Sequence, residues 1–356
     1  MRIRVGALLL ALILCLSTLT ACGGGGGNAD VHVFYYTYSD TYVSTVRSTL
    51  DSKLTEAGVS YQDYDGNGNQ TTQTEQIRTA ITKGAKALLV NIVNTGSDDA
   101  ASEIVGLARD AGVPLIFFNR EVSDTVIKSY DNCAYVGTRS EEAGILQGEM
   151  VGEYLLSHYN AADLNGDGVI SYVLFKGEEG NNEAIYRTKY SVEKANEMLM
   201  AEGKKPLRFY DASNKNGYLV DQNGLWSSAA ANDYMNTILA SNNATNNNMI
   251  ELVICNNDSM AEGAISALNA AGYNTGGNSP TIPVFGVDAT EAAKTLIKNG
   301  KMYGTVQQDA VGMANALALL TGNALDESKG LMDGTETLSV DDTVRKIRIP
   351  YGKYVG

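Results

Sequence analysis

The sequence predicts an α/β protein built from two doubly wound parallel-sheet lobes that are joined by a three-strand hinge. Two observations lead to this fold class. Short β-rich runs alternate with longer stretches of helical period, which is the pattern of a parallel sheet covered by helices on both faces. The same alternation starts again after Ser140, and the chain beyond the first 30 residues is long enough for two domains with sizeable cores.

In the first lobe, strands are expected at 31–38, 87–93, 114–119 and 134–138. Between the first two strands, apolar residues recur at three- and four-residue spacing, as the buried stripe of a helix does. This stripe consists of Val43, Val46, Leu50 and Leu54. The lobe therefore begins with a strand followed by a helix that packs on the sheet.

In the second lobe, strands are expected at 171–176, 207–211, 250–256, 283–288 and 302–307. The expected N-terminal lobe comprises residues 31–138 plus 308–346, and the expected C-terminal lobe comprises residues 139–307 plus 347–356. The chain then crosses between the lobes near Thr138, Val306 and Ile347. Such crossings form a hinge about which two lobes can close on a ligand.

The first residues have the layout of a bacterial secretion signal. Two arginines precede an apolar run from Val5 to Leu16, which is shorter than the roughly 20 residues that a membrane-spanning helix needs. The following Leu19–Cys22 resembles the lipobox, where cleavage exposes a cysteine that is then acylated. Residues 1–21 are thus expected to be a signal peptide, and residues 22–30 the lipidated Cys22 with a glycine-rich tether. The protein would be extracytoplasmic and anchored to the cell membrane through this lipid alone.

The composition excludes several other classes. A formal charge of −14 and a pI near 4.6 argue against nucleic-acid partners and against docking on anionic lipid. With only His32 and His158, histidine-based catalysis and zinc ligation are poorly supplied. Cys133 and Cys255 end apolar runs and are expected to be small buried hydrophobes, although the sequence leaves a disulfide between them open.

Polar side chains follow several of the expected strands, at the edge of the sheet where ligands of α/β proteins bind. They lie in the stretches Tyr38–Tyr42, Asn119–Glu121, Asn256–Asp258 and at Asp288. Amides and carboxylates hydrogen-bond in a plane, which suits the neighbouring hydroxyls of a sugar. Any one of them could instead be a helix N-cap. We favour the cap for Asp258 and a ligand site for the set as a whole.

These stretches resemble the periplasmic galactose/glucose-binding protein family, which has the type I periplasmic-binding-protein fold. The resemblance covers nearly the whole chain after the tether and is carried by 38–42, 113–119, 163–168, 254–258 and 284–288. It implies a monomeric, non-enzymatic protein that binds D-galactose or D-glucose between its lobes and delivers it to the permease of an ABC transporter. The alternatives are another monosaccharide such as xylose, or a sugar sensor for a chemoreceptor or a sensor kinase.

The resemblance also implies which residues bind the sugar. Tyr42 and Trp226 match the two aromatic residues that sandwich the pyranose, although by composition alone Trp226 could equally lie in the core. The polar positions that match are Asp40, Asn119, Arg187, Asn257 and Asp288. An alternative for Arg187 is an i,i+4 salt bridge with Glu183. Segment 214–225, which precedes Trp226, is either a lip over the pocket or an ordinary surface loop.

Three expected sugar-binding positions depart from the family. Asn181, Glu183 and Gln308 stand where the family typically has His, Asp and Asn. Each replacement keeps polarity and changes reach, and a mispaired buried polar group costs roughly 1–3 kcal/mol. The class of ligand therefore follows from the sequence more firmly than the identity of the sugar.

A second motif predicts a structural calcium ion. Positions 1, 3, 5, 7 and 9 of an EF-hand loop are filled by Asp163, Asn165, Asp167, Val169 through its carbonyl, and Ser171. Position 12 is Leu174, and the resemblance implies that Glu251 supplies the missing carboxylate. Ser171 is shorter than the amide of the family, so it would ligate through water. The alternative is a plain Asp/Asn/Gly turn.

Two other functions would need features that suit this sequence less well. A sugar-cleaving enzyme would need paired carboxylates, for which Glu178, Glu179 and Glu183, or Asp40 with Asp288, are available. A ring of amides around an arginine suits binding better than proton transfer. A sugar-responsive transcription factor would need a DNA-reading helix pair before the first lobe, where this chain has the signal peptide.

Overall fold

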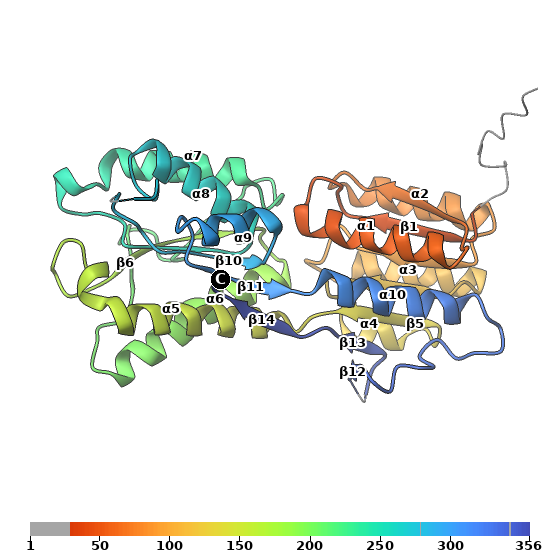
Figure 1. Cartoon of the computed structure of the whole chain (residues 1–356). Helices are drawn as coiled ribbons and strands as arrows, with labels where there is room; N and C mark the ends of the chain where they lie inside the picture. The colour runs from red at the N-terminus through yellow and green to blue at the C-terminus, as the bar shows by residue number, and fades with distance from the viewer. Residues whose placement is uncertain (1–28, 278, 342) are drawn as a thin grey trace, which may run out of the picture.

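The computed structural model describes residues 29–277, 279–341 and 343–356. The expected signal peptide, the expected lipidation site Cys22 and nearly all of the expected tether lie outside the described residues. The rest of the chain forms two lobes that lie end to end, with the C-terminal lobe on the left and the N-terminal lobe on the right in Figure 1. Each lobe is a sheet with helices on both faces, which confirms the predicted fold class.

The N-terminal lobe contains a seven-stranded sheet in the order β12-β13-β5-β4-β3-β1-β2. All neighbouring strands are parallel except β12 and β13. The strands are β1 (Val31–Tyr35), β2 (Tyr61–Asp65), β3 (Ala87–Val90), β4 (Leu115–Phe118), β5 (Cys133–Gly137), β12 (Ser339–Val340) and β13 (Lys346–Arg348).

The C-terminal lobe repeats this design with the order β14-β11-β10-β9-β6-β7, and β8 also pairs with β6. Here only β14 is antiparallel to its neighbour. The strands are β6 (Ser171–Lys176), β7 (Arg208–Phe209), β8 (Leu219–Val220), β9 (Leu252–Cys255), β10 (Val284–Asp288), β11 (Gly304–Gln308) and β14 (Tyr351–Tyr354).

Helices cover both faces of each sheet, because consecutive residues of a buried strand point to opposite sides. In β1, Val33 packs with residues of α1 and α10, whereas Phe34 packs with residues of α2, α3 and α4. In β6, Val173 faces α7, α8 and α9, whereas Leu174 faces α5 and α6. The helices are α1 (Thr41–Glu56), α2 (Gln70–Thr82), α3 (Asp99–Ala111), α4 (Asp124–Lys128), α5 (Ser140–Ala162), α6 (Asn182–Ala201), α7 (Ser228–Ser241), α8 (Asp258–Ala270), α9 (Glu291–Lys298) and α10 (Ala310–Ala324), with a 3₁₀ turn at Ala244–Asn246.

The chain crosses between the lobes three times, as predicted. The crossings lie between β5 and α5, between β11 and α10, and between β13 and β14. The second crossing follows β11, at Asp309, so Gln308 belongs to the C-terminal lobe and not to the N-terminal lobe as expected. Because β13 belongs to the N-terminal sheet, the third crossing lies at Ile349 and Pro350, slightly later than the expected Ile347. The crossings are tied together where the hydroxyls of Thr138 and Tyr351 lie 2.8 Å apart.

Some strands were not predicted. β2 has the sequence YQDYD, whose polar residues lack the apolar run that marks the neighbouring strands. β8 and β12 have two residues each, and β7 covers only Arg208–Phe209 of the expected 207–211. Short edge strands bury little apolar surface, so their pattern is weak.

The cysteines confirm one sequence expectation. Cys133 and Cys255 are both buried and free, and they lie in different lobes.

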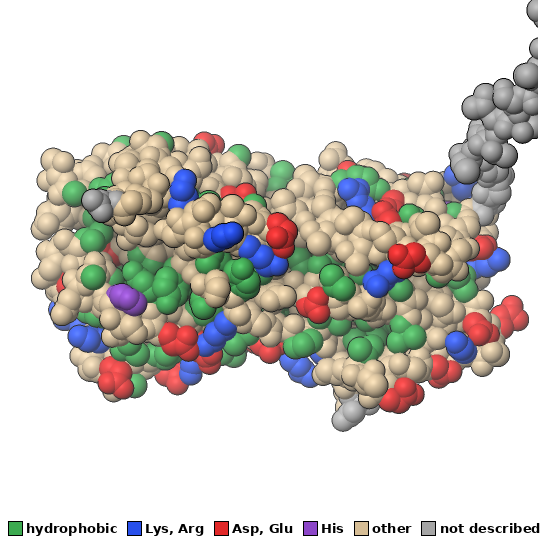
Figure 2. Space-filling view, viewed as in Figure 1, with side chains coloured by type: hydrophobic (Ala, Val, Ile, Leu, Met, Phe, Trp, Pro, Cys, Tyr) green, Lys and Arg blue, Asp and Glu red, His purple; other side chains and the backbone are tan. Residues whose placement is uncertain are grey.

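On the face shown in Figure 2, a waist separates the lobes, and acidic and basic side chains lie interspersed. In the described part of the chain, no helix is both long and apolar enough to cross a bilayer.

Candidate functional site

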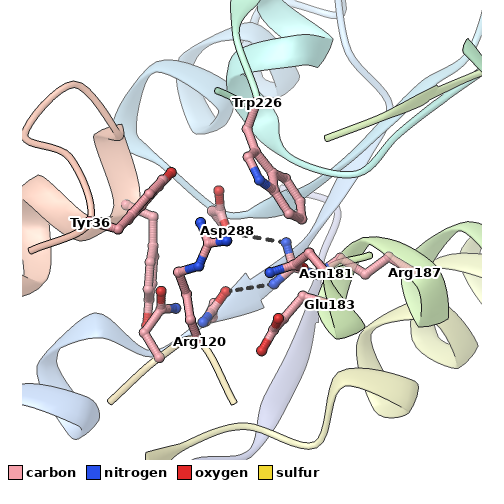
Figure 3. Close-up of a pocket in the computed structure, with 10 residues that line it drawn as sticks. Tyr36, Arg120, Asn181, Glu183, Arg187, Trp226 and Asp288 are labelled. Atoms are coloured by element: carbon pink, nitrogen blue, oxygen red, sulfur yellow. Dashed lines mark hydrogen bonds and ion pairs between the residues drawn. The ribbon is translucent and has the colours of Figure 1, made fainter. Parts of the chain in front are cut away.

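A pocket lies between the two lobes, at the carboxyl ends of strands from both sheets. The N-terminal lobe contributes Tyr36, Tyr42, Asn119 and Arg120 to it. The C-terminal lobe contributes Asn181, Glu183, Arg187, Trp226, Asp288 and Gln308 (Figure 3). We call these ten residues the interlobe pocket.

The structure therefore brings together the expected sugar-binding residues except Asp40 and Asn257, which do not line the pocket. Both act as helix N-caps that also support an aromatic wall. Asp40 caps α1, and its Oδ2 accepts a 2.6 Å hydrogen bond from the hydroxyl of Tyr36. Asn257 caps α8, and its Nδ2 donates to the carbonyl of Trp226 at 3.2 Å. Both residues thus stand directly behind the pocket.

Arg187 is the most connected residue of the interlobe pocket. It projects from the second turn of α6, and its Nη2 donates to Gln308 Oε1 at 2.9 Å and to the Tyr351 hydroxyl at 3.0 Å. Its Nη1 donates to the carbonyl of Asn256 and lies 3.9 Å from Asp288 Oδ1. Dashed lines in Figure 3 mark contacts among the residues drawn, Arg187 and Asp288 included. A planar fork of donors is thereby fixed at the centre of the site.

Burial shapes the electrostatics of this centre. It raises the pKa of Asp288 well above its ordinary value, and the charge of Arg187 opposes that rise. For Arg187, burial favours the neutral form, but Tyr351 and Asp288 outweigh it and raise the pKa. Glu183 also has a raised pKa because it is buried. Its Oε1 accepts from the backbone N–H of Glu121 at 3.1 Å, so it does not form the i,i+4 salt bridge with Arg187 that the sequence left open.

Four residues of the interlobe pocket carry a buried polar atom that has no hydrogen-bond partner among the described residues. The atoms are Arg120 Nε, Glu183 Oε2, Arg187 Nε and Gln308 Nε2. Leaving such a group unpaired costs about 1–3 kcal/mol, so each one needs an explanation. Three are donors and one is an acceptor, and they come from both lobes. A ligand in the pocket that both accepts and donates hydrogen bonds is the kind of partner that these four atoms lack.

Aromatic rings form the other walls. Trp226 is buried, which agrees with either sequence reading, but it lines the interlobe pocket instead of a core cluster. Its backbone φ is +55°, a conformation that few non-glycine residues adopt. The ring lies directly on Gly177, where an added Cβ would come within 2.0 Å of it. The tryptophan is thus held in place by a close backbone approach that only glycine allows.

The lobes touch across the pocket. Arg120 of the N-terminal lobe forms a 2.6 Å ion pair with Glu178 of the C-terminal lobe, and its guanidinium stacks 4.4 Å above the Tyr36 ring. Glu178 Oε2 also accepts from Trp226 Nε1 at 3.3 Å. A second bridge joins Asn181 Nδ2 to the hydroxyl of Thr95 at 3.2 Å. These contacts hold the lobes together around the pocket.

Sequence reasoning missed Tyr36 as a lining residue and Glu178 as a bridging residue, and it placed Arg120 in the strand-end stretch Asn119–Glu121 without naming it as a sugar-binding residue. Tyr36 directly follows β1, and Arg120 follows Asn119, so the rule that ligands bind at strand ends could have found both. Segment 214–225 does not line the pocket, which favours the surface-loop alternative. Its Asp221 accepts hydrogen bonds from the backbone and hydroxyl of Ser227 and so fixes the residue after Trp226.

The preference for an N-cap role at Asp258 was wrong. Asn257 caps α8, and Asp258 is the first residue of the helix. Its side chain is fully buried and accepts hydrogen bonds from the Thr290 backbone and the Thr305 hydroxyl. Two adjacent polar residues therefore have different roles: Asn257 is the helix cap, and Asp258 is a buried carboxylate.

The 163–171 loop lies in the C-terminal lobe, before β6. Gly168 adopts φ +72°, as the sharp turn requires, and Asp163 accepts hydrogen bonds from the backbone N–H groups of Asp167 and Gly168. Glu251 lies across the loop, where its two oxygens accept from the backbone N–H groups of Leu164, Asn165 and Ser171. The sequence therefore correctly placed Glu251 beside the loop.

Other contacts of the loop bear on a metal ion. Asp167 Oδ2 pairs with Arg208 at 2.7 Å, and the Ser171 hydroxyl donates to the carbonyl of Met249 at 2.7 Å. Across residues 29–277, 279–341 and 343–356, no group of three or more His, Cys, Asp or Glu side chains is gathered as a metal site. The calcium ion stays a prediction, with Asp163, Asn165 and Glu251 as the best-placed side chains.

Comparisons with known proteins agree with this architecture. Residues 31–329 match the family model described as a periplasmic binding protein domain. The chain is 35% identical over 322 residues to the D-galactose/methyl-galactoside binding periplasmic protein of Haemophilus influenzae, which covers 90% of this chain and 88% of that protein.

Two solved structures share the fold. An ABC transporter solute binding protein of Bacillus halodurans with bound myo-inositol has a TM-score of 0.69 at 24% identity, covering 93% of this chain and 96% of that one. An ABC transporter solute binding protein of Clostridium phytofermentans with bound β-D-glucose has a TM-score of 0.69 at 20% identity, covering 91% and 93%. At these identities the likeness concerns the fold alone.

Proposed function

This chain belongs to the periplasmic binding protein family, and we propose that it binds one monosaccharide, D-galactose or D-glucose, between its lobes and delivers it to an ABC transporter. The family consists of substrate-binding proteins and not of enzymes, which confirms that the chain is not an enzyme. The 35% sequence identity to the D-galactose/methyl-galactoside binding protein of Haemophilus influenzae supports galactose or glucose as the ligand.

The observation that carries the proposal is the set of unpaired polar atoms in the interlobe pocket. A ligand that satisfies them must accept from Arg120, Arg187 and Gln308 and donate to Glu183. Hydroxyl groups do both, so a polyhydroxylated ring meets these demands. An aliphatic or aromatic ligand without hydroxyls would leave them unpaired and lose about 1–3 kcal/mol for each.

The charges of the pocket favour a neutral sugar over a sugar phosphate or a sugar acid. Arg120 is already paired with Glu178 at 2.6 Å, and Arg187 lies 3.9 Å from Asp288. An anionic ligand would have to displace these carboxylates or be buried beside them, which is costly for unpaired charge. The rings of Tyr42 and Trp226 then supply flat apolar surfaces for the C–H faces of the sugar.

Delivery follows from the division of the site between two lobes. Residues from both lobes contact one ligand, so binding favours the state in which the three crossings bring the lobes together. The bridges from Arg120 to Glu178 and from Asn181 to Thr95 each join one lobe to the other, so they stabilise that state. A permease can then distinguish the loaded protein by the shape of its closed lobes.

The proposal includes an anchor and an ion. We propose that acylated Cys22 holds the protein to the outer face of the cell membrane, on the strength of the lipobox-like Leu19–Cys22. We also propose that the 163–171 loop holds one Ca²⁺ through Asp163, Asn165, the Val169 carbonyl and Glu251, with Asp167 contributing when it leaves Arg208. The ion would tie the loop to the segment that bears Glu251 and take no part in sugar binding.

Isothermal titration calorimetry on the chain from Gly23 onward tests the proposed function. The panel is galactose, glucose, xylose, ribose, myo-inositol and glucose 6-phosphate. Saturable one-to-one binding of galactose or glucose, with no binding of glucose 6-phosphate, is the expected result. Binding of none of the neutral sugars, or hydrolysis of a nitrophenyl galactoside, would refute the proposal.

Labelling with a fatty-acid analogue, compared between the full chain and Cys22→Ala, tests the anchor.

A further inference from the structure

The backbone that carries Asp288 into the interlobe pocket is strained. Asp288 has φ +126° and the next residue, Ala289, has φ +56°, so two consecutive non-glycine residues adopt positive φ. Such a conformation is strained and persists only where its surroundings hold it. Asp288 ends β10, and its carboxylate faces Arg187. The groups that hold this segment therefore decide where a pocket carboxylate lies.

Two buried side chains outside the pocket hold the segment. Asp258 Oδ2 accepts from the backbone N–H of Thr290 at 2.8 Å. The hydroxyl of Thr305 accepts from the N–H of Ala289 at 3.3 Å and donates to Asp258 Oδ1 at 2.6 Å. Both side chains are fully buried, and neither is a lining residue. The two amides that follow Asp288 are thus fixed by one hydroxyl and one carboxylate.

Gly286 makes room for this arrangement because it has no side chain. Thr305 lies on β11 opposite Gly286 of β10, and the carboxylate of Asp258 reaches between them. A Cβ at residue 286 would come within 2.3 Å of Asp258 Oδ1. Glycine therefore leaves room for the carboxylate, and burial in this place raises the pKa of Asp258 to about 7. A buried acidic group that contacts no ligand needs such a reason to be there.

We propose that Asp258 and Thr305 are positioning residues for sugar binding. They hold the strained segment 288–290 in the conformation that presents Asp288 to the ligand, and they raise affinity without contacting the sugar. The inference rests on the proposed function, since Asp288 matters only if the interlobe pocket binds a ligand. The carboxylate is required because it accepts two hydrogen bonds, whereas an amide accepts with only one of its two polar atoms.

Thr305→Val tests the inference, with Thr305→Ser as the matched control. Valine keeps the branched shape and removes the hydroxyl, whereas serine keeps the hydroxyl. We expect Thr305→Val to weaken binding of the preferred sugar about tenfold or more, and Thr305→Ser to stay within threefold of the unmodified protein. In a double-mutant cycle with Asp288→Asn, the two losses should not add, because Thr305 acts through Asp288.

Amide hydrogen exchange of the sugar-free protein provides a second readout. Exchange at Ala289 and Thr290 should accelerate in Thr305→Val and in Asp258→Asn, while exchange in the N-terminal lobe stays unchanged. Unchanged affinity in Thr305→Val, or additive losses in the cycle, would overturn the inference while leaving the proposed function intact. If the unmodified protein binds no sugar, the proposed function fails, and this inference fails with it.

Discussion

Two clusters of acidic and amide residues in this protein look alike in the sequence and differ in the structure. The interlobe pocket leaves four buried polar atoms without a partner among the described residues. In the 163–171 loop, by contrast, the oxygens of Asp163 and Glu251 accept backbone N–H groups, and Asp167 pairs with Arg208. The pocket is incomplete without a ligand, whereas the loop is closed by its own hydrogen bonds.

This difference separates two uses of the same residue types. Buried polar groups that bind a ligand must stay unpaired in the protein, and the ligand then repays their desolvation. Polar groups that shape a turn are paired at once with nearby backbone. We therefore expect changes in the pocket to alter sugar affinity, and changes in the loop to alter stability or cation binding instead.

The largest effect is expected for Arg187→Met. This change removes the Nε donor and leaves Asp288 buried beside an apolar side chain. Arg187 and Asp288 are both buried, and truncating one partner of a buried charge pair costs about 2–5 kcal/mol, so affinity should fall about 30-fold or more by calorimetry. The matched control is Arg208→Met, since Arg208 is half exposed and pairs with Asp167 in the loop. Equal losses of sugar affinity in both variants would contradict the comparison.

A smaller effect is expected for Glu183→Gln. Gln can keep the bond from the Glu121 backbone, but its amide nitrogen replaces the unpaired acceptor Oε2. A sugar hydroxyl that donates to this position would lose its partner, and affinity should fall about tenfold, as expected for a hydrogen bond to a charged group. Calorimetry against glucose and galactose measures it. An unchanged affinity would mean that Glu183 Oε2 does not face the ligand.

The corresponding change in the loop is Glu251→Gln, which should act on stability. Three backbone N–H groups donate to the two carboxylate oxygens, and the amide can accept with only one of its polar atoms. The free energy of unfolding should fall by about 1–3 kcal/mol in urea denaturation, because a buried N–H loses its partner. Sugar affinity should stay within twofold, and a tenfold loss would show that loop and pocket are coupled.

The smallest effect is expected when the proposed Ca²⁺ is removed. Because the loop is closed by protein hydrogen bonds, chelation with EDTA should lower the melting temperature only slightly and leave sugar affinity unchanged. Arg208→Met frees Asp167 Oδ2, so it should raise the affinity for Ca²⁺, or for Tb³⁺ followed by luminescence. Failure of both ions to bind either variant would identify the loop as a plain turn.

The sequence predicted most of the fold because the inner strands are continuous apolar runs. β6 was predicted with its observed bounds, and the stripe of α1 is buried as expected. β2 was missed because its sequence, YQDYD, contains no apolar run and the strand lies at the edge of the sheet. A strand that is buried on both faces is recognised by its continuous apolar run, and a half-buried edge strand lacks such a run.

The pocket was predicted less completely, for a different reason. Asp40 and Asn257 belong to residue types that serve equally as caps and as ligand contacts, and only their hydrogen bonds show the cap. Tyr36 was missed because the expected first strand was drawn through Tyr38, whereas β1 ends at Tyr35 and leaves Tyr36 at the strand end. The role of Asp258 depends on positive φ at residues that are not glycine, which sequence patterns do not reveal.

The most direct test of the account is tryptophan fluorescence of the chain from Gly23 onward, titrated with galactose and glucose. Trp226 is the sole tryptophan and lines the interlobe pocket, so its emission reports on that site alone. The account predicts a saturable change with one of these hexoses that is lost in Arg187→Met and kept in Arg208→Met. A fluorescence that stays constant with every neutral sugar, or a response that survives in Arg187→Met, would contradict it.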